Sequence, residues 1–501
     1  MTITDKLKGL KSEYPEKIAL IDLKNRREAS FSEIDAESER AVSYLRKAGF
    51  KEGDRIILFI PVSMDFYIIL MALFKMGIQA VFIDPYAGIS HINKCSSLVS
   101  PEGIIGDWKI LFLGSMLKEI RKIPLKINYR DIFSEKSIHE NHTETDINSI
   151  TEDTPALISF TSGSTGFPKV IMRTHGFLLG QHNVLEKNLK FGENTGVYSS
   201  FPMFLLSHMA GGSTTVIPDI DFRKPARTGG RTVLEQLRES NAKNIVLPPS
   251  ILENLTEYML ENAIRMEGME TVYTGGAPVF PRLMDSLAET FPGCRIRALY
   301  GDSEAEPISL LNYEDITERE RDGMKEGKGL LAGNKVNEIE IKINGETGEI
   351  SVKGENVLKG YLQDNDNRKN LDSDMGKWHD TGDTGYLDNE GRLFLLGRLK
   401  GIIRIEGQIY YLFSIETAFS FCKGIKKSAL AVKNDRLYLI AEKDRSFTGK
   451  LEEDMEVAKL KEKFGIFKII EGKIPVDKRH NSKVDYRKLE KLMEKYWKQG
   501  F

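Results

Sequence analysis

A glycine- and hydroxyl-rich run from Thr161 to Lys169 is the segment of this chain best suited to holding an anion. It directly follows the apolar run Ala156 to Phe160, which predicts a buried strand. Glycines let the backbone approach a ligand closely, so that N–H groups point at it, while hydroxyls and a lysine add donors. A polyphosphate matches such a set of donors. The residues expected to bind it are Thr161, Ser162, Gly163, Ser164, Thr165, Gly166 and Lys169.

Two other kinds of glycine-rich segment fit this run less well. A Walker A loop needs Gly-Lys-Ser/Thr at a fixed spacing, and no such tripeptide follows here. A flexible Ser/Gly linker rarely begins directly after a buried strand, and it rarely ends in Pro-Lys as this run does at Pro168 and Lys169. The sequence therefore predicts a phosphate-binding loop after a strand.

Two further motifs follow predicted strands. Gly275 to Pro278 follows Thr271 to Thr274, and glycine there lets the backbone press against a flat ring. Taken alone, this motif is more typical of an ordinary turn. Tyr300 to Glu304 follows Ile296 to Leu299 and ends in a carboxylate, a hard oxygen ligand of the kind that Mg²⁺ binds. The two motifs therefore offer a backbone surface and a metal ligand.

The order of these motifs resembles the adenylate-forming superfamily, which comprises acyl-CoA synthetases, adenylation domains of peptide synthetases and luciferase-like enzymes. The resemblance runs from about Tyr14 to Leu489 and includes the run Lys51 to Arg55 and the pair Asp84-Pro85. It implies ATP and Mg²⁺ as cofactors. It also implies that a substrate carboxylate attacks the α-phosphate of ATP, that pyrophosphate leaves, and that an acyl-adenylate forms.

The resemblance implies a role for each motif. Glu304 would bind Mg²⁺, and Tyr300 would stack on adenine. Asp383, in Thr381-Gly382-Asp383, would accept hydrogen bonds from the ribose hydroxyls. Arg398 would assist at the ribose or phosphate, and Lys483 would be a catalytic lysine together with Lys169 of the loop. The other residues expected at the nucleotide are Gly275, Gly276, Ala277, Pro278, Gly301 and Ser303, the last standing where the family usually has threonine.

An apolar segment from Phe201 to His208 falls at the acyl site of the family. A lone histidine is most often structural, but this position favours His208 as a catalytic gate near the substrate carboxylate. Gly211 and the run Val246 to Pro249 would complete the wall of the acyl pocket. These segments contain no acidic residue that could pair with a substrate ammonium. A fatty or other hydrophobic acid is therefore favoured over an amino acid.

Three departures from the family lie in the C-terminal part. Lys400 stands at the hinge, where aspartate is usual. Leu412 and Ser414 replace the usual proline and first glutamate, and Ser482 replaces the glycine before Lys483. These changes bear more on the second half-reaction, in which the acyl group is transferred from the adenylate to an acceptor, than on formation of the adenylate.

The acceptor of the acyl group stays open between three candidates. Coenzyme A is favoured by its frequency in the family. The substrate's own β-hydroxyl would give a β-lactone, and the phosphopantetheine of a carrier protein is the third candidate. Four strings resemble the β-lactone synthetases of bacterial olefin biosynthesis, namely Ile83 to Pro85, Gly275 to Val279, Ser303 to Ile308 and His480 to Asp485.

A non-catalytic acyl-nucleotide-binding or scaffold protein is the alternative outside enzymes. It is disfavoured because five residues expected to act together are all present, namely Lys169, Glu304, Asp383, Arg398 and Lys483.

The elements that must position these residues indicate an α/β fold. Helical spacing at 34–47 and 65–76 alternates with strands at 55–60 and 79–83, which is typical of βαβ units and a parallel sheet. Short strands are predicted at 339–343, 349–352 and 393–396 between turn signals. We expect an AMP-binding N-terminal domain of layered sheets and helices over 1–397, with a β-rich subdomain at about 335–397. A small, mobile α+β lid would occupy 398–501, with the hinge near Lys400.

Composition agrees with a soluble, multidomain protein. A chain of 501 residues is too long for one ordinary core, and its net charge of -2 gives no general reason to bind nucleic acid. Its three cysteines lie far apart, which fits a reducing compartment. The apolar run Phe66 to Phe74 is shorter than the roughly 20 residues of a membrane span, so a buried helix is predicted. The N-terminus has no apolar signal core, and we expect a cytoplasmic protein whose oligomeric state stays open. The polar residues 134–153 predict a surface loop.

Overall fold

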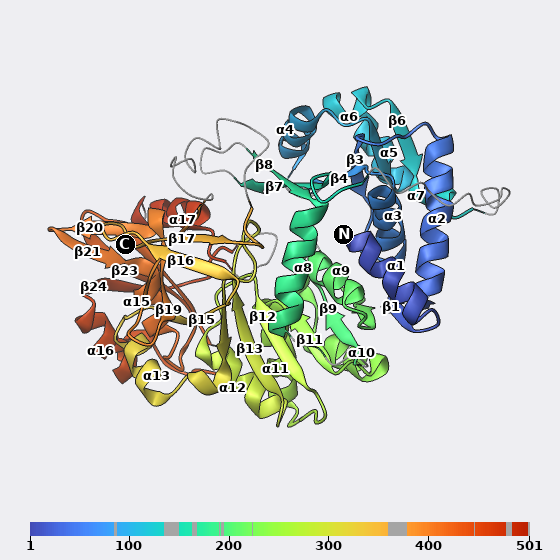
Figure 1. Cartoon of the computed structure of the whole chain (residues 1–501). Coiled ribbons are helices and arrows are strands. Elements are labelled where there is room, and N and C mark those ends of the chain that lie inside the picture. The colour runs from blue at the N-terminus through green and yellow to red at the C-terminus, as the bar shows by residue number, and fades with distance from the viewer. Residues whose placement is uncertain are drawn as a thin grey trace.

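The computed structural model describes residues 1–84, 88–134, 150–162, 168–189, 191, 195–222, 224–358, 378–444, 446–476 and 483–498. The chain has the α/β architecture expected from its sequence. A large N-terminal domain contains two extensive sheets covered by helices, and a smaller C-terminal domain follows (Figure 1). Most of the surface loop predicted at 134–153 lies outside the described residues.

The first sheet has six strands in the order β6-β5-β3-β4-β7-β8. Strands β3 to β7 pair in parallel, and β8 pairs antiparallel with β7. The predicted helices at 34–47 and 65–76 are confirmed as α2 and α3. The bounds are α2 (Phe31–Lys47), β3 (Arg55–Phe59), α3 (Met64–Lys75), β4 (Gln79–Phe82), α4 (Ile89–Val99), β5 (Gly103–Gly106), α5 (Trp108–Ser115), α6 (Lys118–Lys122), β6 (Leu125–Asn128), α7 (Tyr129–Ile132), β7 (Pro155–Ser162) and β8 (Pro168–Thr174).

The apolar helix α3 is buried, as its sequence predicts. The side chain of Ser63 caps it by accepting a hydrogen bond from the N–H of Phe66. All residues from Phe66 to Phe74 are buried, and the helix contacts both β4 of the first sheet and β1 of the second. A helix that is apolar on all sides requires such a position between layers. No helix among the described residues is long and apolar enough to span a bilayer.

The second sheet has thirteen strands in the order β16-β17-β18-β19-β15-β14-β13-β12-β11-β9-β10-β1-β2. Its strands from β1 to β13 pair in parallel, apart from the edge strand β2, and those from β14 onward pair antiparallel. The bounds are β1 (Ile18–Asp22), β2 (Arg27–Ser30), β9 (Val197–Ser199), β10 (Thr215–Ile217), β11 (Asn244–Leu247), β12 (Thr271–Gly275), β13 (Arg295–Tyr300), β14 (Ser309–Asn312), β15 (Leu330–Lys335), β16 (Ile339–Ile343), β17 (Glu349–Gly354), β18 (His379–Leu387) and β19 (Arg392–Arg398).

The strands predicted at 339–343, 349–352 and 393–396 are confirmed as β16, β17 and β19. They do not form a sheet of their own, because β19 pairs with β15 and so joins them to the large sheet. Helices that cover this domain include α1 (Ile3–Glu13), α8 (His175–Leu189), α9 (Pro202–Ala210), α10 (Gly230–Ser240), α11 (Pro249–Glu261), α12 (Pro281–Thr290) and α13 (Glu318–Lys325).

The C-terminal domain is a three-stranded sheet with helices and a small hairpin. Its core is a cluster of buried apolar side chains that includes Phe419 and Leu439. The bounds are η4 (Leu399–Gly401), β20 (Ile402–Ile405), β21 (Gln408–Tyr411), α15 (Leu412–Phe419), β22 (Ile425–Lys433), β23 (Arg436–Lys443), α16 (Met455–Lys463), β24 (Ile466–Glu471) and α17 (Tyr486–Lys498).

Candidate active site

Side chains from two other strands meet at the partly buried carboxylate of Asp383. Asp383 on β18 lies opposite Arg398 on β19 in the strand register, and Arg398 Nε is 3.0 Å from Asp383 Oδ1. The hydroxyl of Tyr300, the last residue of β13, donates to Asp383 Oδ2 at 3.0 Å. The backbone N–H of Asp383 donates to the Thr381 side chain. The structure therefore brings together the three residues expected at adenine and ribose.

Burial governs the protonation of this group. It raises the pKa of Asp383, while the charge of Arg398, the hydrogen bond from Tyr300 and the charge of Lys483 lower it in part. Burial and the neighbouring carboxylates also raise the pKa of Tyr300 well above its usual value. Tyr300 therefore stays a neutral hydrogen-bond donor over the ordinary pH range.

Glu304 lies in a second polar cluster, in the loop after β13. One ligand atom each from Asp302, Glu304 and His379 lie within 4.8 Å of one another. Asp302 Oδ1 accepts from the backbone N–H groups of Glu304 and Ala305, which fixes the loop. The two carboxylates are ligands of the kind that Mg²⁺ binds, as expected at Glu304, whereas the imidazole of His379 is more typical of a transition-metal site.

The charged groups of this cluster shift one another's pKa values. Burial and Asp302 raise the pKa of Glu304, whereas His379, Arg173 and Lys169 lower it. Burial alone would lower the pKa of His379, but its 3.1 Å hydrogen bond with Asp302 and the nearby carboxylates raise it overall. Both shifts favour the protonated forms of Glu304 and His379, and a bound cation would oppose them.

Lys169 lies on β8 and not in a loop. Thr161 and Ser162 belong to β7 and pair with Lys169 and Pro168 in an antiparallel hairpin, so the predicted strand is longer and the loop shorter than expected. Strand β7 extends to Ser162 because Thr161 and Ser162 continue its antiparallel pairing with β8. Gly163, Ser164, Thr165 and Gly166 lie outside the described residues, as do the side chains of Thr161 and Ser162.

The glycine motif after β12 borders an aromatic ring. Gly276 has φ +77°, and an added Cβ would lie 3.4 Å from the ring of Phe201. An added Cβ at Gly275 would lie 2.7 Å from the backbone oxygen of Leu299. Ala277 and Pro278 complete the turn, while Gly301 and Ser303 occupy the loop after β13. The backbone of Gly275 therefore lies close to β13, one residue before Tyr300, and the role of this turn at the nucleotide stays a prediction.

His208 is buried in an aromatic cluster. Its ring packs edge-on against Phe191 at 4.4 Å between centroids and also contacts Phe204. Burial and the charge of His182 lower its pKa to about 3, so the imidazole is neutral. Its Nε2 has no hydrogen-bond partner among the described residues. Val246 and Tyr273 belong to the same apolar cluster, whereas Gly211 ends α9.

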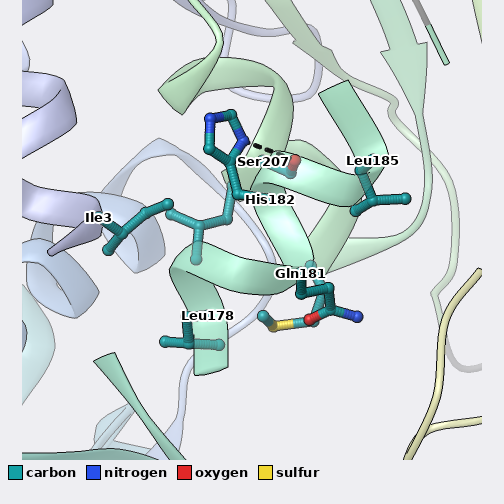
Figure 2. Close-up of a pocket in the computed structure, with 8 residues that line it drawn as sticks. Ile3, Leu178, Gln181, His182, Leu185 and Ser207 are labelled. Atoms are coloured by element: carbon teal, nitrogen blue, oxygen red, sulfur yellow. Dashed lines mark hydrogen bonds between the residues drawn. The ribbon is translucent and has the colours of Figure 1, made fainter. Parts of the chain in front are cut away.

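A small, mostly apolar cavity lies beside this cluster, between α1, α8 and α9 (Figure 2). His182 Nδ1 and Ser207 Oγ are 3.0 Å apart at its wall. None of its lining residues belongs to the expected nucleotide site. The lining residues are Ile3, Leu178, Gln181, His182, Leu185, Met203, Leu206 and Ser207.

Comparison with known proteins places the chain in a family. A model of the AMP-binding enzyme family matches residues 10–362. The chain belongs to that family. It is therefore an AMP-forming acid ligase of the adenylate-forming fold.

Individual relatives of this AMP-binding enzyme are distant. It is 24% identical over 434 residues to an olefin β-lactone synthetase of Xanthomonas campestris pv. campestris, across 80% of this chain and 77% of that protein. It is also 24% identical to a 4-coumarate–CoA ligase of Pinus taeda, across 79% and 76%. Its fold is similar to that of O-succinylbenzoate coenzyme A synthetase from Bacillus subtilis in complex with AMP, with a TM-score of 0.79, 21% identity and coverage of 97% and 98%.

Lys483 of this AMP-binding enzyme lies in the C-terminal domain, three residues before α17. Its side chain is exposed, yet its charge acts on Asp383 of the large domain. Lys400 lies in η4, directly after β19. Leu412 and Ser414, the residues that depart from the family pattern, are buried in α15.

Sequence reasoning missed several residues of this site. Asp302 and His379 complete the cluster around Glu304, and Arg173 donates to the backbone oxygen of Ser303 at 2.6 Å. Asp302 and His379 each lie within four residues of an expected site residue, and that proximity was the available signal. Arg173 gave none, because its contact joins β8 to a loop 130 residues away.

Proposed function

We propose that this enzyme uses ATP to activate a hydrophobic, fatty carboxylic acid as its acyl-adenylate, releases pyrophosphate, and then transfers the acyl group to coenzyme A. The proposal rests chiefly on one observation. Tyr300, Asp383 and Arg398, the residues expected at adenine and ribose, lie together, with the Tyr300 hydroxyl and Arg398 Nε each 3.0 Å from a carboxylate oxygen of Asp383.

The nucleotide would lie across the carboxyl ends of β12 and β13 and the middle of β18. Tyr300 would stack on adenine, backed by the turn from Gly275 to Pro278. Asp383 would accept hydrogen bonds from the ribose hydroxyls, replacing the bond that it now receives from Tyr300. Arg398 would keep Asp383 ionised and in place. The residues 161–166 and Lys169 would hold the phosphates.

The chain's own cations would stabilise the charge that develops at the α-phosphate. Lys483 would bridge the substrate carboxylate and the α-phosphate, which positions the attacking oxygen and offsets negative charge. Lys169 lies near Glu304, where it would face the leaving pyrophosphate. When bound at Glu304, Mg²⁺ would neutralise charge on the phosphate oxygens. Asp302 would hold Glu304 in position by accepting hydrogen bonds from the backbone N–H groups of Glu304 and Ala305.

The acyl group would lie against the aromatic cluster around His208. Phe201 connects this cluster to Gly276 of the nucleotide site, so an acid whose carboxylate reaches the α-phosphate would place its apolar body there. The neutral imidazole of His208 supports a hydrophobic rather than an anionic environment. These features favour a fatty acid and suit His208 as a gate beside the carboxylate.

The second half-reaction would require a rotation of the C-terminal domain. We propose that residues 1–397 form the AMP-binding domain, with the strands of about 335–397 as its β-rich part, and that residues 398–501 form the lid. Lys400 is the proposed hinge because it lies in the short η4 between β19 and β20.

A β-lactone synthetase acting on a 3-hydroxy fatty acid is the second candidate. It is favoured by the similarity to the Xanthomonas olefin β-lactone synthetase. The altered residues Leu412 and Ser414 agree with it, since a β-hydroxyl attacking within the substrate needs no channel for a thiol. Transfer to a carrier protein is a third candidate.

The test is a pyrophosphate-release screen of fatty, 3-hydroxy fatty and aromatic acids, each with and without coenzyme A, followed by mass spectrometry. Thioester formed only when coenzyme A is present supports the ligase. Turnover of a 3-hydroxy acid to lactone and AMP without a thiol would replace it with the β-lactone synthetase. Pyrophosphate release with none of these acids would refute the proposed substrate class.

A further inference from the structure

Helix α5 of the six-stranded sheet presents large apolar side chains to solvent. Trp108 is 58% exposed and Phe112 is 67% exposed, and Met116 in the turn after the helix is 76% exposed. Their spacing of four residues places Trp108 and Phe112 on one side of the helix. We call these three residues the α5 face. Isolated exposed apolar side chains are ordinary, but a run of three large ones on adjacent turns marks an interaction surface.

The opposite side of α5 explains how the helix is held. Ile110 and Leu111 are partly buried against the apolar core of the sheet. Gly114 is buried, and an added Cβ there would lie 3.0 Å from the side chain of Ile120 in α6. Because α5 is anchored through these residues, the exposure of the α5 face is set by the fold.

Lysines and arginines are frequent in and after α5. Lys109 lies 5.6 Å from the centre of the Trp108 ring. Helix α6, which contacts α5, carries the exposed Lys118, Arg121 and Lys122, the last of which pairs with Glu119. Residues 88–134 contain seven lysines and arginines against four acidic residues, whereas the chain as a whole has a net charge of -2. This segment is therefore basic in an otherwise slightly acidic protein.

We propose that the α5 face and its surrounding lysines and arginines dock this enzyme on an anionic lipid bilayer. Tryptophan is favoured at the boundary between headgroups and acyl chains, and phenylalanine and methionine add apolar contact. Lysine and arginine around such a stripe are attracted to anionic headgroups. Figure 1 shows α4, α5 and α6 together at one end of the molecule, away from the C-terminal strands.

A second copy of the chain is a poorer occupant. A two-fold symmetric contact would bring the same basic segment of both copies together. Like charges would then oppose association, whereas an anionic bilayer neutralises them. The docking does not depend on turnover, so it can be tested without knowing the substrate.

The test uses the full chain and vesicles of phosphatidylcholine, with or without phosphatidylglycerol. We expect the wild type to sediment with the anionic vesicles and about tenfold less with the neutral ones. The double variant Trp108→Ser/Phe112→Ser should bind the anionic vesicles about tenfold more weakly. In a Trp378→Phe/Trp497→Phe background, the emission of Trp108 should shift to shorter wavelength on binding.

The matched control is Met455→Ser/Phe467→Ser, which removes two exposed apolar side chains from the C-terminal domain, 84% and 50% exposed. This control should bind vesicles like the wild type. Circular dichroism and light scattering check the fold and mass of each variant. Equal sedimentation of the wild type and the α5 variant would overturn the proposal. A change of oligomeric mass caused by the α5 variant would assign the face to contact between copies instead.

Discussion

At the expected ribose site, the carboxylate of Asp383 already has hydrogen-bonding and ion-pair partners within the protein. Asp383 receives a hydrogen bond from Tyr300 and pairs with Arg398, so it is held in one orientation before any ligand arrives. Such fixed geometry lowers the cost of ordering when a ligand binds. Lys483 differs from Asp383 in that its side chain is exposed and belongs to the C-terminal domain.

Replacing Lys483 by alanine should lower adenylate formation by about a hundredfold or more, the usual cost of losing one charge that stabilises a phosphoryl transition state. ATP–pyrophosphate exchange measures this step. A preformed acyl-AMP should still be consumed at close to the wild-type rate, because the second step does not need this charge. The exposed Lys491→Ala is the matched control. Wild-type exchange in the Lys483 variant would exclude this residue as the catalytic lysine.

Glu416 of α15 predicts a pH-dependent stability. It is buried, accepts from the hydroxyl of Tyr486 and from the N–H of Leu430, and burial raises its pKa to about 7 despite those hydrogen bonds. The unfolded pKa is 4.5, so the folded state binds the extra proton between pH 4.5 and 7, and stability falls as pH rises through that window.

The variant Glu416→Gln cannot ionise. Its free energy of unfolding relative to the wild type should therefore increase by about 3 kcal/mol between pH 4.5 and pH 8. Urea denaturation followed by the fluorescence of Trp497, which lies in the same domain, measures the difference. Glu453→Gln, with a 68% exposed side chain, is the matched control. A gap that stays constant with pH would contradict the assignment of a raised pKa to Glu416.

Elements of the fold were predictable where they follow a single periodic pattern. The predicted helix at 34–47 and strand at 79–83 match α2 and β4 within a few residues. The hairpin of β7 and β8 was not predictable, because Thr161 and Ser162 have the composition of a loop and become strand only by pairing across it. Contacts between distant segments, such as His379 with Asp302, leave no local pattern either.

Gly333 of the thirteen-stranded sheet lies at a position where the neighbouring strand leaves no room for a side chain. It has φ +84° at the bulge where β15 pairs with β19, and an added Cβ would lie 2.0 Å from the oxygen of Leu310 in β14. Gly333→Ala should therefore lower the free energy of unfolding by about 3 kcal/mol or more, since both the backbone angle and the neighbouring strand must change. Gly345→Ala, where an added Cβ meets nothing within 4 Å, is the control. Thermal melting compares them, and equal midpoints would refute the expectation.

At the scale of the whole molecule, the two domains touch through apolar side chains such as Phe280 and Phe413 and through a few polar contacts. Arg282 of α12 forms a 2.6 Å ion pair with Asp444 and donates to the backbone oxygen of Ile425 at 3.3 Å. Burial alone would raise the pKa of Asp444, but hydrogen bonds from Ser446 and Arg282 lower it to about 2. This ion pair therefore holds α12 against the C-terminal domain, and we expect it to favour the arrangement of the two domains in this structure.

Arg282→Met should weaken that arrangement without touching the reacting groups. Exposed ion pairs contribute up to about 1 kcal/mol, so adenylate formation should slow by about fivefold. Consumption of preformed acyl-AMP should stay constant or rise, because the lid leaves this arrangement more readily. Arg319→Met is the matched control, since Arg319 pairs with Glu390 within the large domain. Equal loss in both half-reactions would show that Arg282 supports the fold in general, and wild-type rates in both would show that the ion pair does not bias the lid.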